Sequence, residues 1–243
     1  FLLRIIHLRL ICKSTECIDC CLSCFTKFFS KSYYFDTLIN SFKVSITATV
    51  LSIAIGTPLA YLFTIFKIKG KSVLNILIVV ASMSAPFIGA YSWILLLGRS
   101  GVITAFFKNL GIAIPDIYGF GGIVLVMTLQ LFPLVFLYAK GALKNIDNSL
   151  IEAAENLGCS GIACFFKVVV PLIMPTLLAA ALLVFMRSFA DFGTPMLIGE
   201  GYRTFPVVLY TEFINEVGGS DGFAAAIAVI AIVVTTLVFL VQK

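Results

Sequence analysis

Five uncharged apolar runs divide this 243-residue chain, and each is long enough to cross a bilayer, which takes about 20 residues. Sixty per cent of the residues are apolar and only 12% are charged, more apolar surface than a water-soluble domain of this length can bury. Backbone groups in lipid must be satisfied within the segment, and the alternation of a barrel strand is absent, so each run should be helical. We therefore expect an all-α polytopic membrane helix bundle with about five transmembrane helices, at residues 44–66, 72–98, 117–139, 168–186 and 223–241.

The charged loops predict the orientation of these helices. Lysines cluster in two of the connections, whereas the loop at 191–222 carries five acidic residues against Arg203 alone. The positive-inside rule places the lysine-rich loops in the cytoplasm and the acidic loop outside. The lysines are Lys67, Lys69, Lys71, Lys140, Lys144 and Lys167. Two shorter apolar segments, 101–114 and 204–213, are too short to span the bilayer and should lie at the outer interface or re-enter the membrane.

One cytoplasmic loop carries its own helix signals. Ser149 and Glu152 have capping-box spacing, which predicts a short helix from this point. Ala153 and Ala154 are small enough for another backbone to approach closely, and Gly158 can adopt the left-handed conformation that ends a helix. An isolated capping box would indicate only a capped surface helix between two spans.

The stretch IEAAENLGCSGIACFFKVVVP, residues 151–171, resembles the EAA loop of ABC importer permeases. The spacing from Glu152-Ala153-Ala154 to Gly158 and then to Pro171 matches that loop, with valines in place of its Ile and Leu. The resemblance implies a cytoplasmic coupling helix, and a transport subunit in a prokaryotic plasma membrane. Its partners would be cytoplasmic ABC ATPase subunits, an extracytoplasmic solute-binding protein, and a second permease half or another copy of this chain.

A second resemblance concerns the substrate. Residues 188–206, SFADFGTPMLIGEGYRTFP, are similar to a segment of iron(III) importer permeases, and more distantly to the sulfate, molybdate and polyamine branches. Other related branches carry 2-aminoethylphosphonate or thiamine.

Arg187 and Asp191 are four residues apart, so on a continuing helix they would share a face and form an ion pair. The alternative is that Asp191 lines the solute path.

The resemblance is to the N-terminal half of iron(III)-type permeases, in which two homologous halves are usually fused. We therefore expect residues 36–243 to form one half of the transmembrane domain, in a chain that is a fragment or pairs with a second half. Residues 1–35 form an atypical segment whose CIDCCLSC sequence has metal-ligand spacing, although nothing in the resemblance calls for a metal. We interpret its beginning, up to about Cys24, as a truncated or miscalled start.

Catalytic and nucleic-acid-binding patterns are lacking. Gly70-Lys71-Ser72 mimics the end of a phosphate-binding loop, but the glycine required five residues earlier is Ile65. With one histidine in the chain, neither a hydrolase triad nor a histidine metal centre can be built. The net charge of +5 is spread over loop anchors, which argues against nucleic acid. The sequence predicts a non-enzymatic transport subunit without a cofactor; the alternatives are an ion-coupled secondary carrier and an inert membrane fragment.

Overall fold

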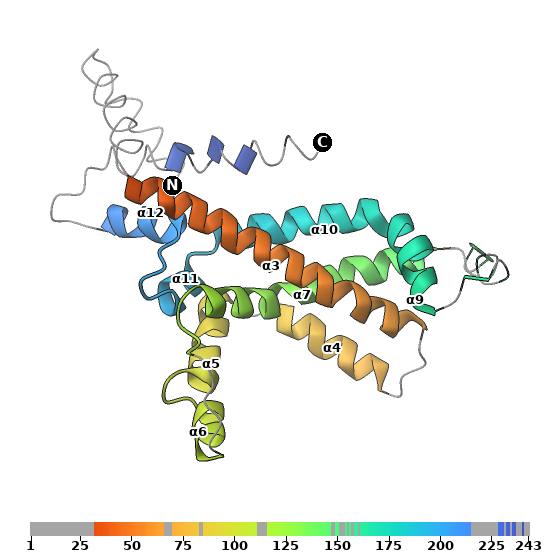
Figure 1. Ribbon diagram of the computed structural model, residues 1–243. Coiled ribbons are helices and arrows are strands. Elements are labelled where there is room, and N and C mark those ends of the chain that lie inside the picture. The colour runs from red at the N-terminus through yellow and green to blue at the C-terminus, as the bar shows by residue number, and fades with distance from the viewer. Residues whose placement is uncertain are drawn as a thin grey trace, which may run out of the picture. The chain divides into compact units, whose positions relative to one another are not determined.

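The computed structural model describes residues 32–65, 70–82, 85–110, 116–146 and 161–214, with scattered positions in 149–159 and 228–240 (Figure 1). Every regular element in these residues is a helix, which confirms the predicted all-α class. The elements in chain order are α3 (Ser32–Ile65), α4 (Lys71–Ser82), α5 (Pro86–Leu97), α6 (Val102–Asn109), α7 (Phe120–Lys144), α9 (Gly161–Cys164), the π-helix η1 (Phe165–Val169), α10 (Val170–Ala190), α11 (Gly193–Ile198) and α12 (Phe205–Ile214).

The chain folds into two compact units. The terminal unit comprises the described parts of Phe1–Ser41 and Arg203–Lys243, and the central unit comprises Phe42–Tyr202. In the terminal unit, the amide of Phe205 at the start of α12 donates to the Ser41 hydroxyl at 2.8 Å. The Tyr34 hydroxyl donates to Glu212 at 3.2 Å, so α12 is tied to the first turns of α3 at both ends. The helix expected near 204–213 is therefore present.

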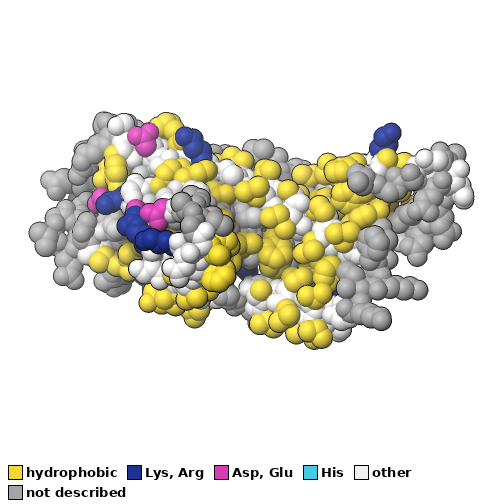
Figure 2. Space-filling view, turned by 60° about the horizontal axis from the view of Figure 1, so that its bottom comes forward, with side chains coloured by type: hydrophobic (Ala, Val, Ile, Leu, Met, Phe, Trp, Pro, Cys, Tyr) yellow, Lys and Arg dark blue, Asp and Glu magenta, His cyan; other side chains and the backbone are white. Residues whose placement is uncertain are grey.

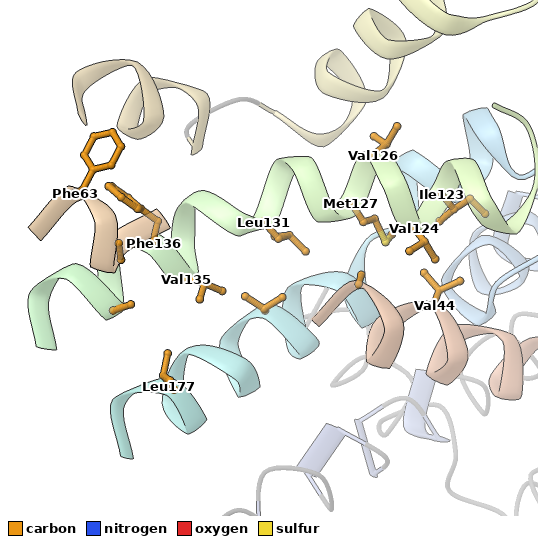
Figure 3. Close-up of a cluster of buried hydrophobic side chains, with 14 of the residues drawn as sticks. Val44, Phe63, Ile123, Val124, Val126, Met127, Leu131, Val135, Phe136 and Leu177 are labelled. Carbon is orange, nitrogen blue, oxygen red and sulfur yellow. The ribbon is translucent and has the colours of Figure 1, made fainter. Parts of the chain in front are cut away.

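Helix α7 is the centre of the central unit. It packs against α10, α4, α5 and α11. Helix α3 contacts it through Phe63, whose ring meets that of Phe136 edge-on at 5.2 Å (Figure 3). Close approach of α3 and α7 depends on Gly56, because a Cβ there would lie 2.9 Å from that of Val135. Buried aliphatic side chains of α7, including Ile123 and Leu131, fill the space between these helices (Figure 3).

Four helical segments of the described chain are long and apolar enough to cross a membrane. Three of them confirm predicted spans at 44–66, 117–139 and 168–186 with adjusted ends. These are Ser32–Thr64, Phe120–Lys144 and Phe165–Ala190. The fourth, Phe87–Asn109, was not predicted, and the predicted fifth span at 223–241 lies largely outside the described residues.

The prediction of one continuous span at 72–98 was wrong. Helix α4 ends at Ser82, Ala85 is extended with ψ 140°, and α5 begins at Pro86. Proline disfavours the helical conformation in the residue before it and suits the first turn of a new helix, so Pro86 divides the run. Helices α5 and α6 together then make the membrane-length segment Phe87–Asn109. Most of the short apolar segment predicted at 101–114 therefore belongs to this longer segment.

Large apolar side chains cover much of the exposed surface (Figure 2). None of the α4 side chains is buried. Leu125 on α7 and Leu172 and Leu178 on α10 are also exposed. Apolar exposure on this scale is unusual for a water-soluble monomer and is what a lipid-facing surface requires.

Candidate functional site

The loop between α7 and α9 contains the predicted short helix. Helix α7 ends at Lys144, and among the described loop residues Ser149, Leu150, Ala154 and Asn156 are helical. Glu152 and Ala153 lie outside the described residues, so the structure provides no geometry for the predicted capping box.

The end of this loop helix is defined by Gly158. Its φ is 86°, the left-handed conformation expected from the sequence. The amide of Cys159 donates to the carbonyl of Ala154 at 3.0 Å, five residues back, which is the hydrogen bond of a Schellman motif with glycine at C′. A Cβ on Gly158 would meet no atom within 4 Å, so only the backbone conformation favours glycine here.

Pro171 explains how the chain returns from this loop into the membrane. It lies in the first turn of α10, directly after η1, where the Val170 amide bonds to the carbonyl of Phe165 five residues back. Proline has no N–H, and its ring crowds the carbonyl four residues earlier, which favours a wider turn at this point. Sequence analysis identified Pro171 as part of the loop motif but did not predict the π-helix that precedes it.

Phe165 anchors the returning chain to α3. The side chains of Phe165 and Val169 are buried, and the Phe165 ring lies 4.5 Å from that of Tyr61. Sequence analysis did not single out Phe165, because an apolar residue before an apolar run carries no distinguishing signal. The loop is therefore joined to the helix bundle through a packed aromatic contact.

Asp191 and Arg187 do not form the predicted ion pair. Helix α10 ends at Ala190, and the ψ of 122° at Asp191 turns the following chain away from the helix axis, which brings the amide of Gly193 and the hydroxyl of Thr194 to the Asp191 carboxylate. The Asp191 carboxylate instead accepts hydrogen bonds from the Gly193 amide at 2.9 Å and the Thr194 hydroxyl at 2.6 Å. Arg187 is exposed.

These hydrogen bonds join the Asp191 carboxylate to the first two residues of α11, Gly193 and Thr194. Burial raises the pKa of its carboxyl, and the hydrogen bonds from Thr194 and Gly193 only partly offset that rise. The next residue, Phe192, meets the Phe87 ring edge-on at 5.0 Å, so the turn is packed against α5. A carboxylate occupied in this way supports a structural role more than a place in the solute path.

A second polar cluster, missed in the sequence, connects three loops of the central unit. Arg99 forms ion pairs with Asp116 at 3.0 Å and with Glu200 at 2.9 Å, and its guanidinium lies over the Tyr118 ring at 4.8 Å. Glu200 has φ 46°, the one positive φ outside glycine among the described residues. Because these charges are exposed, the ion pairs contribute little to stability.

The described residues hold no cluster of three or more His, Cys, Asp or Glu side chains that could bind a metal ion. The cysteine-rich sequence CIDCCLSC lies outside them, so the structure does not test its ligand spacing. The boundary expected between 35 and 36 likewise remains a prediction.

Comparison with known families decides what kind of protein carries this loop. The model of the family described as binding-protein-dependent transport system inner membrane component matches residues 52–243. The chain belongs to this family. Membership places the Gly158 turn and Pro171 within an importer-permease domain, whereas the cysteine-rich start lies before the matched region.

Relatives of the permease chain differ in the solute that their names give. It is 27% identical to the putative ferric transport system permease protein FbpB 1 of Haemophilus influenzae, over 88% of this chain and 34% of the relative. It is 29% identical to the molybdenum transport system permease protein ModB of Escherichia coli K12, over 85% and 90% of the two chains. It is 27% identical to the spermidine/putrescine permease PotB of H. influenzae, over 86% and 74%. The chain thus spans about a third of the ferric permease and most of the other two.

Solved structures show the same fold. The permease chain superposes with a TM-score of 0.76 on a chain of a bacterial alginate ABC transporter crystallised with its periplasmic protein, at 13% identity, covering 99% of this chain and 91% of that one. A chain of the inward-facing MetNI methionine transporter gives a TM-score of 0.67 at 14% identity, covering 85% and 91%. At these identities the likeness concerns the fold alone.

Proposed function

We propose that this chain is a transmembrane subunit of a binding-protein-dependent ABC importer in a prokaryotic plasma membrane, driven by separate cytoplasmic ATPase subunits. An extracytoplasmic solute-binding protein would deliver the solute, and a second permease half or another copy of this chain would complete the pathway. Family membership and the membrane-length helices support this assignment. The observation that carries the mechanism is the loop helix that ends at Gly158 with a Schellman hydrogen bond.

The loop helix receives the motion of the ATPase and passes it to the bundle. A helix with small residues at Ala153 and Ala154 can seat closely in a groove of the partner. The turn at Gly158 fixes where it ends, and the buried Phe165 joins the following segment to Tyr61 of α3. Rigid-body movement of the loop helix would then move α3 and α10 together, as alternating access requires.

This mechanism requires the loop to be cytoplasmic, as the lysine distribution predicts. The test is labelling of single cysteines in intact cells with a membrane-impermeant thiol reagent, in a background where the native cysteines are replaced. Arg203→Cys should label in intact cells, and Glu155→Cys only after the cells are permeabilised. The opposite pattern would reverse the orientation and remove the loop from the compartment that contains ATP.

Iron(III) is the solute we favour. The stretch 188–206 resembles the iron(III) branch, and three of the relatives are named as ferric or Fe(3+) permeases. Permeases named for molybdenum and for spermidine and putrescine match with similar identity, so an oxyanion or a polyamine is the second candidate. Uptake of radiolabelled iron(III), molybdate and spermidine by cells expressing the complete transporter would separate them, with iron(III) accumulation expected.

The same cells test the class of transporter. Inactivating the ATPase subunit should abolish uptake, whereas an uncoupler applied while cellular ATP is maintained should leave most of it. An ion-coupled secondary carrier gives the reverse result. Absence of uptake for every solute, with the subunits assembled, would support the inert-fragment alternative.

A further inference from the structure

Three lysines gather where one end of α4 meets α7. Lys140 and Lys144 are four residues apart on α7, and Lys71 is the first residue of α4, which packs along α7. Lys140 donates a hydrogen bond to Asn75, one helical turn after Lys71, so the beginning of α4 lies beside the end of α7. Within the described residues no carboxylate forms an ion pair with any of the three. The cluster therefore presents concentrated positive charge without a described counterion.

Lys140 is held in place within this cluster. Its ammonium donates a hydrogen bond to the side-chain oxygen of Asn75 on α4 and lies 5.4 Å from the centre of the Phe136 ring. The side chain is half-buried, in contrast with the exposed Lys144. A surface lysine ordinarily loses rotamer freedom when it binds an anion, and these contacts have already restricted Lys140.

An apolar strip one leaflet long begins at the same point. Helix α4 has 12 residues, about 18 Å at 1.5 Å per residue, close to half of the roughly 30 Å hydrocarbon core. None of its side chains is buried, and Val73, Leu77 and Val80 are 61%, 58% and 60% exposed. The surface thus combines a cationic end with an apolar strip as long as an acyl chain.

We propose that Lys71, Lys140 and Lys144 bind the headgroup phosphate of an anionic phospholipid whose acyl chains lie along α4. Charge complementarity selects this occupant, because basic clusters at the ends of membrane helices attract anionic lipid headgroups. A zwitterionic lipid offers the same acyl chains without the net charge. The proposal requires only that the chain lies in a membrane, so it can fail while the transport assignment holds, and the reverse is also true.

Native mass spectrometry of the full chain tests this site. The protein in neutral detergent is titrated with phosphatidylglycerol and with phosphatidylcholine of the same chain length, and retained lipid is counted. We expect phosphatidylglycerol to be retained at least tenfold more strongly. Each lysine is expected to contribute about fivefold, and the triple variant Lys71→Gln, Lys140→Gln, Lys144→Gln should lose on the order of 100-fold.

The matched control is Lys108→Gln, which removes an exposed lysine of α6 outside the cluster and should leave retention unchanged. The triple arginine variant keeps the charge and should retain the lipid. If the triple glutamine variant does not fold, the exposed Lys144→Gln alone should still lose about fivefold.

Equal retention of the two lipids, or an unchanged Lys144→Gln variant, would overturn the proposal. Displacement of the lipid by an equal concentration of inorganic phosphate would show a free-anion site instead. Efficient disulfide linkage of two copies through Leu77→Cys would show that a second chain covers α4, and would also overturn it.

Discussion

Two turns of the central unit set the boundary of a helix in different ways: one stops a helix and the other precedes a new one. In the EAA segment, residues 149–171, the stop depends on the backbone, because Gly158 adopts φ 86° in open space. In the Asp191 turn, residues 187–200, the new helix depends on a side chain that accepts two hydrogen bonds. A boundary set by the backbone conformation of a glycine can be predicted from residue type and spacing. A boundary set by a side chain depends on hydrogen-bond partners that only the folded structure shows.

The comparison also separates what each turn is for. A Cβ on Gly158 would meet no atom within 4 Å, and the described residues of the loop helix are mostly exposed. An exposed helix with a defined end is suited to docking to a partner. The Asp191 turn is packed against α5 through Phe192 and Phe87; Asp191 itself is half-buried, and Gly193 and Thr194 are buried. Changes at Asp191 should therefore alter protein stability first, and changes at Gly158 should alter coupling first.

The largest effect on stability is expected for Asp191→Ala. The substitution removes the acceptor for the Gly193 amide and the Thr194 hydroxyl in a half-buried turn, and such losses cost about 1–3 kcal/mol. Asp191→Asn keeps one acceptor oxygen and should cost less. Thermal unfolding of the purified chain in detergent measures both, and an unchanged midpoint for Asp191→Ala would show that the turn does not depend on the carboxylate.

A smaller effect should appear as a pH dependence. Asp191 follows the last residue of the Phe165–Ala190 span, and burial raises the pKa of its carboxyl. The folded state then holds this proton more tightly than the unfolded chain. The stability from that proton is fully present below the ordinary pKa of about 4 and is lost as pH rises through the raised value.

The wild type should thus gain stability relative to Asp191→Asn as the pH is lowered from 7 towards 4. Unfolding midpoints of the two proteins measured across this range provide the test. Parallel curves would mean that the carboxyl titrates alike in the folded and unfolded chain.

The smallest effect is expected for coupling between Arg187 and Asp191. Because the two side chains are not paired, the effects of Arg187→Gln and Asp191→Asn on unfolding free energy should add within about 0.5 kcal/mol. The charge exchange, Arg187→Asp with Asp191→Arg, should not rescue stability. Partial rescue by the exchange would restore the original ion-pair interpretation.

Much of the fold followed from the sequence, for identifiable reasons. Long uncharged runs predicted three of the four membrane-length helices in the described residues. A glycine at position 158 predicted the left-handed backbone conformation found there. Pro86 was visible as a weak point, but apolarity alone does not show where a run is divided, since α7 passes through Pro133 without a break.

The side-chain contacts of the site could not be predicted in the same way. Asp191 was placed on a continuing helix because Arg187 lies four residues before it, and nothing local shows that α10 ends at Ala190. The cluster of Arg99 with Asp116 and Glu200 joins residues as far as 101 positions apart, so it required the tertiary structure.

The central claim, that the loop helix passes ATPase motion to the bundle, is tested most directly by ATP-driven uptake with a pair of Gly→Ala variants in the assembled transporter. Gly158→Ala forces a Cβ into the left-handed conformation, whereas Gly141→Ala adds the same atom to open space at an ordinary helical position of α7. The left-handed conformation costs a non-glycine residue about 1–2 kcal/mol, so the loop helix should end differently while the membrane helices stay intact. We predict normal abundance for both variants, with uptake reduced several-fold for Gly158→Ala and unchanged for Gly141→Ala. Equal uptake by the two variants, at equal abundance and equal ATPase association, would contradict the account.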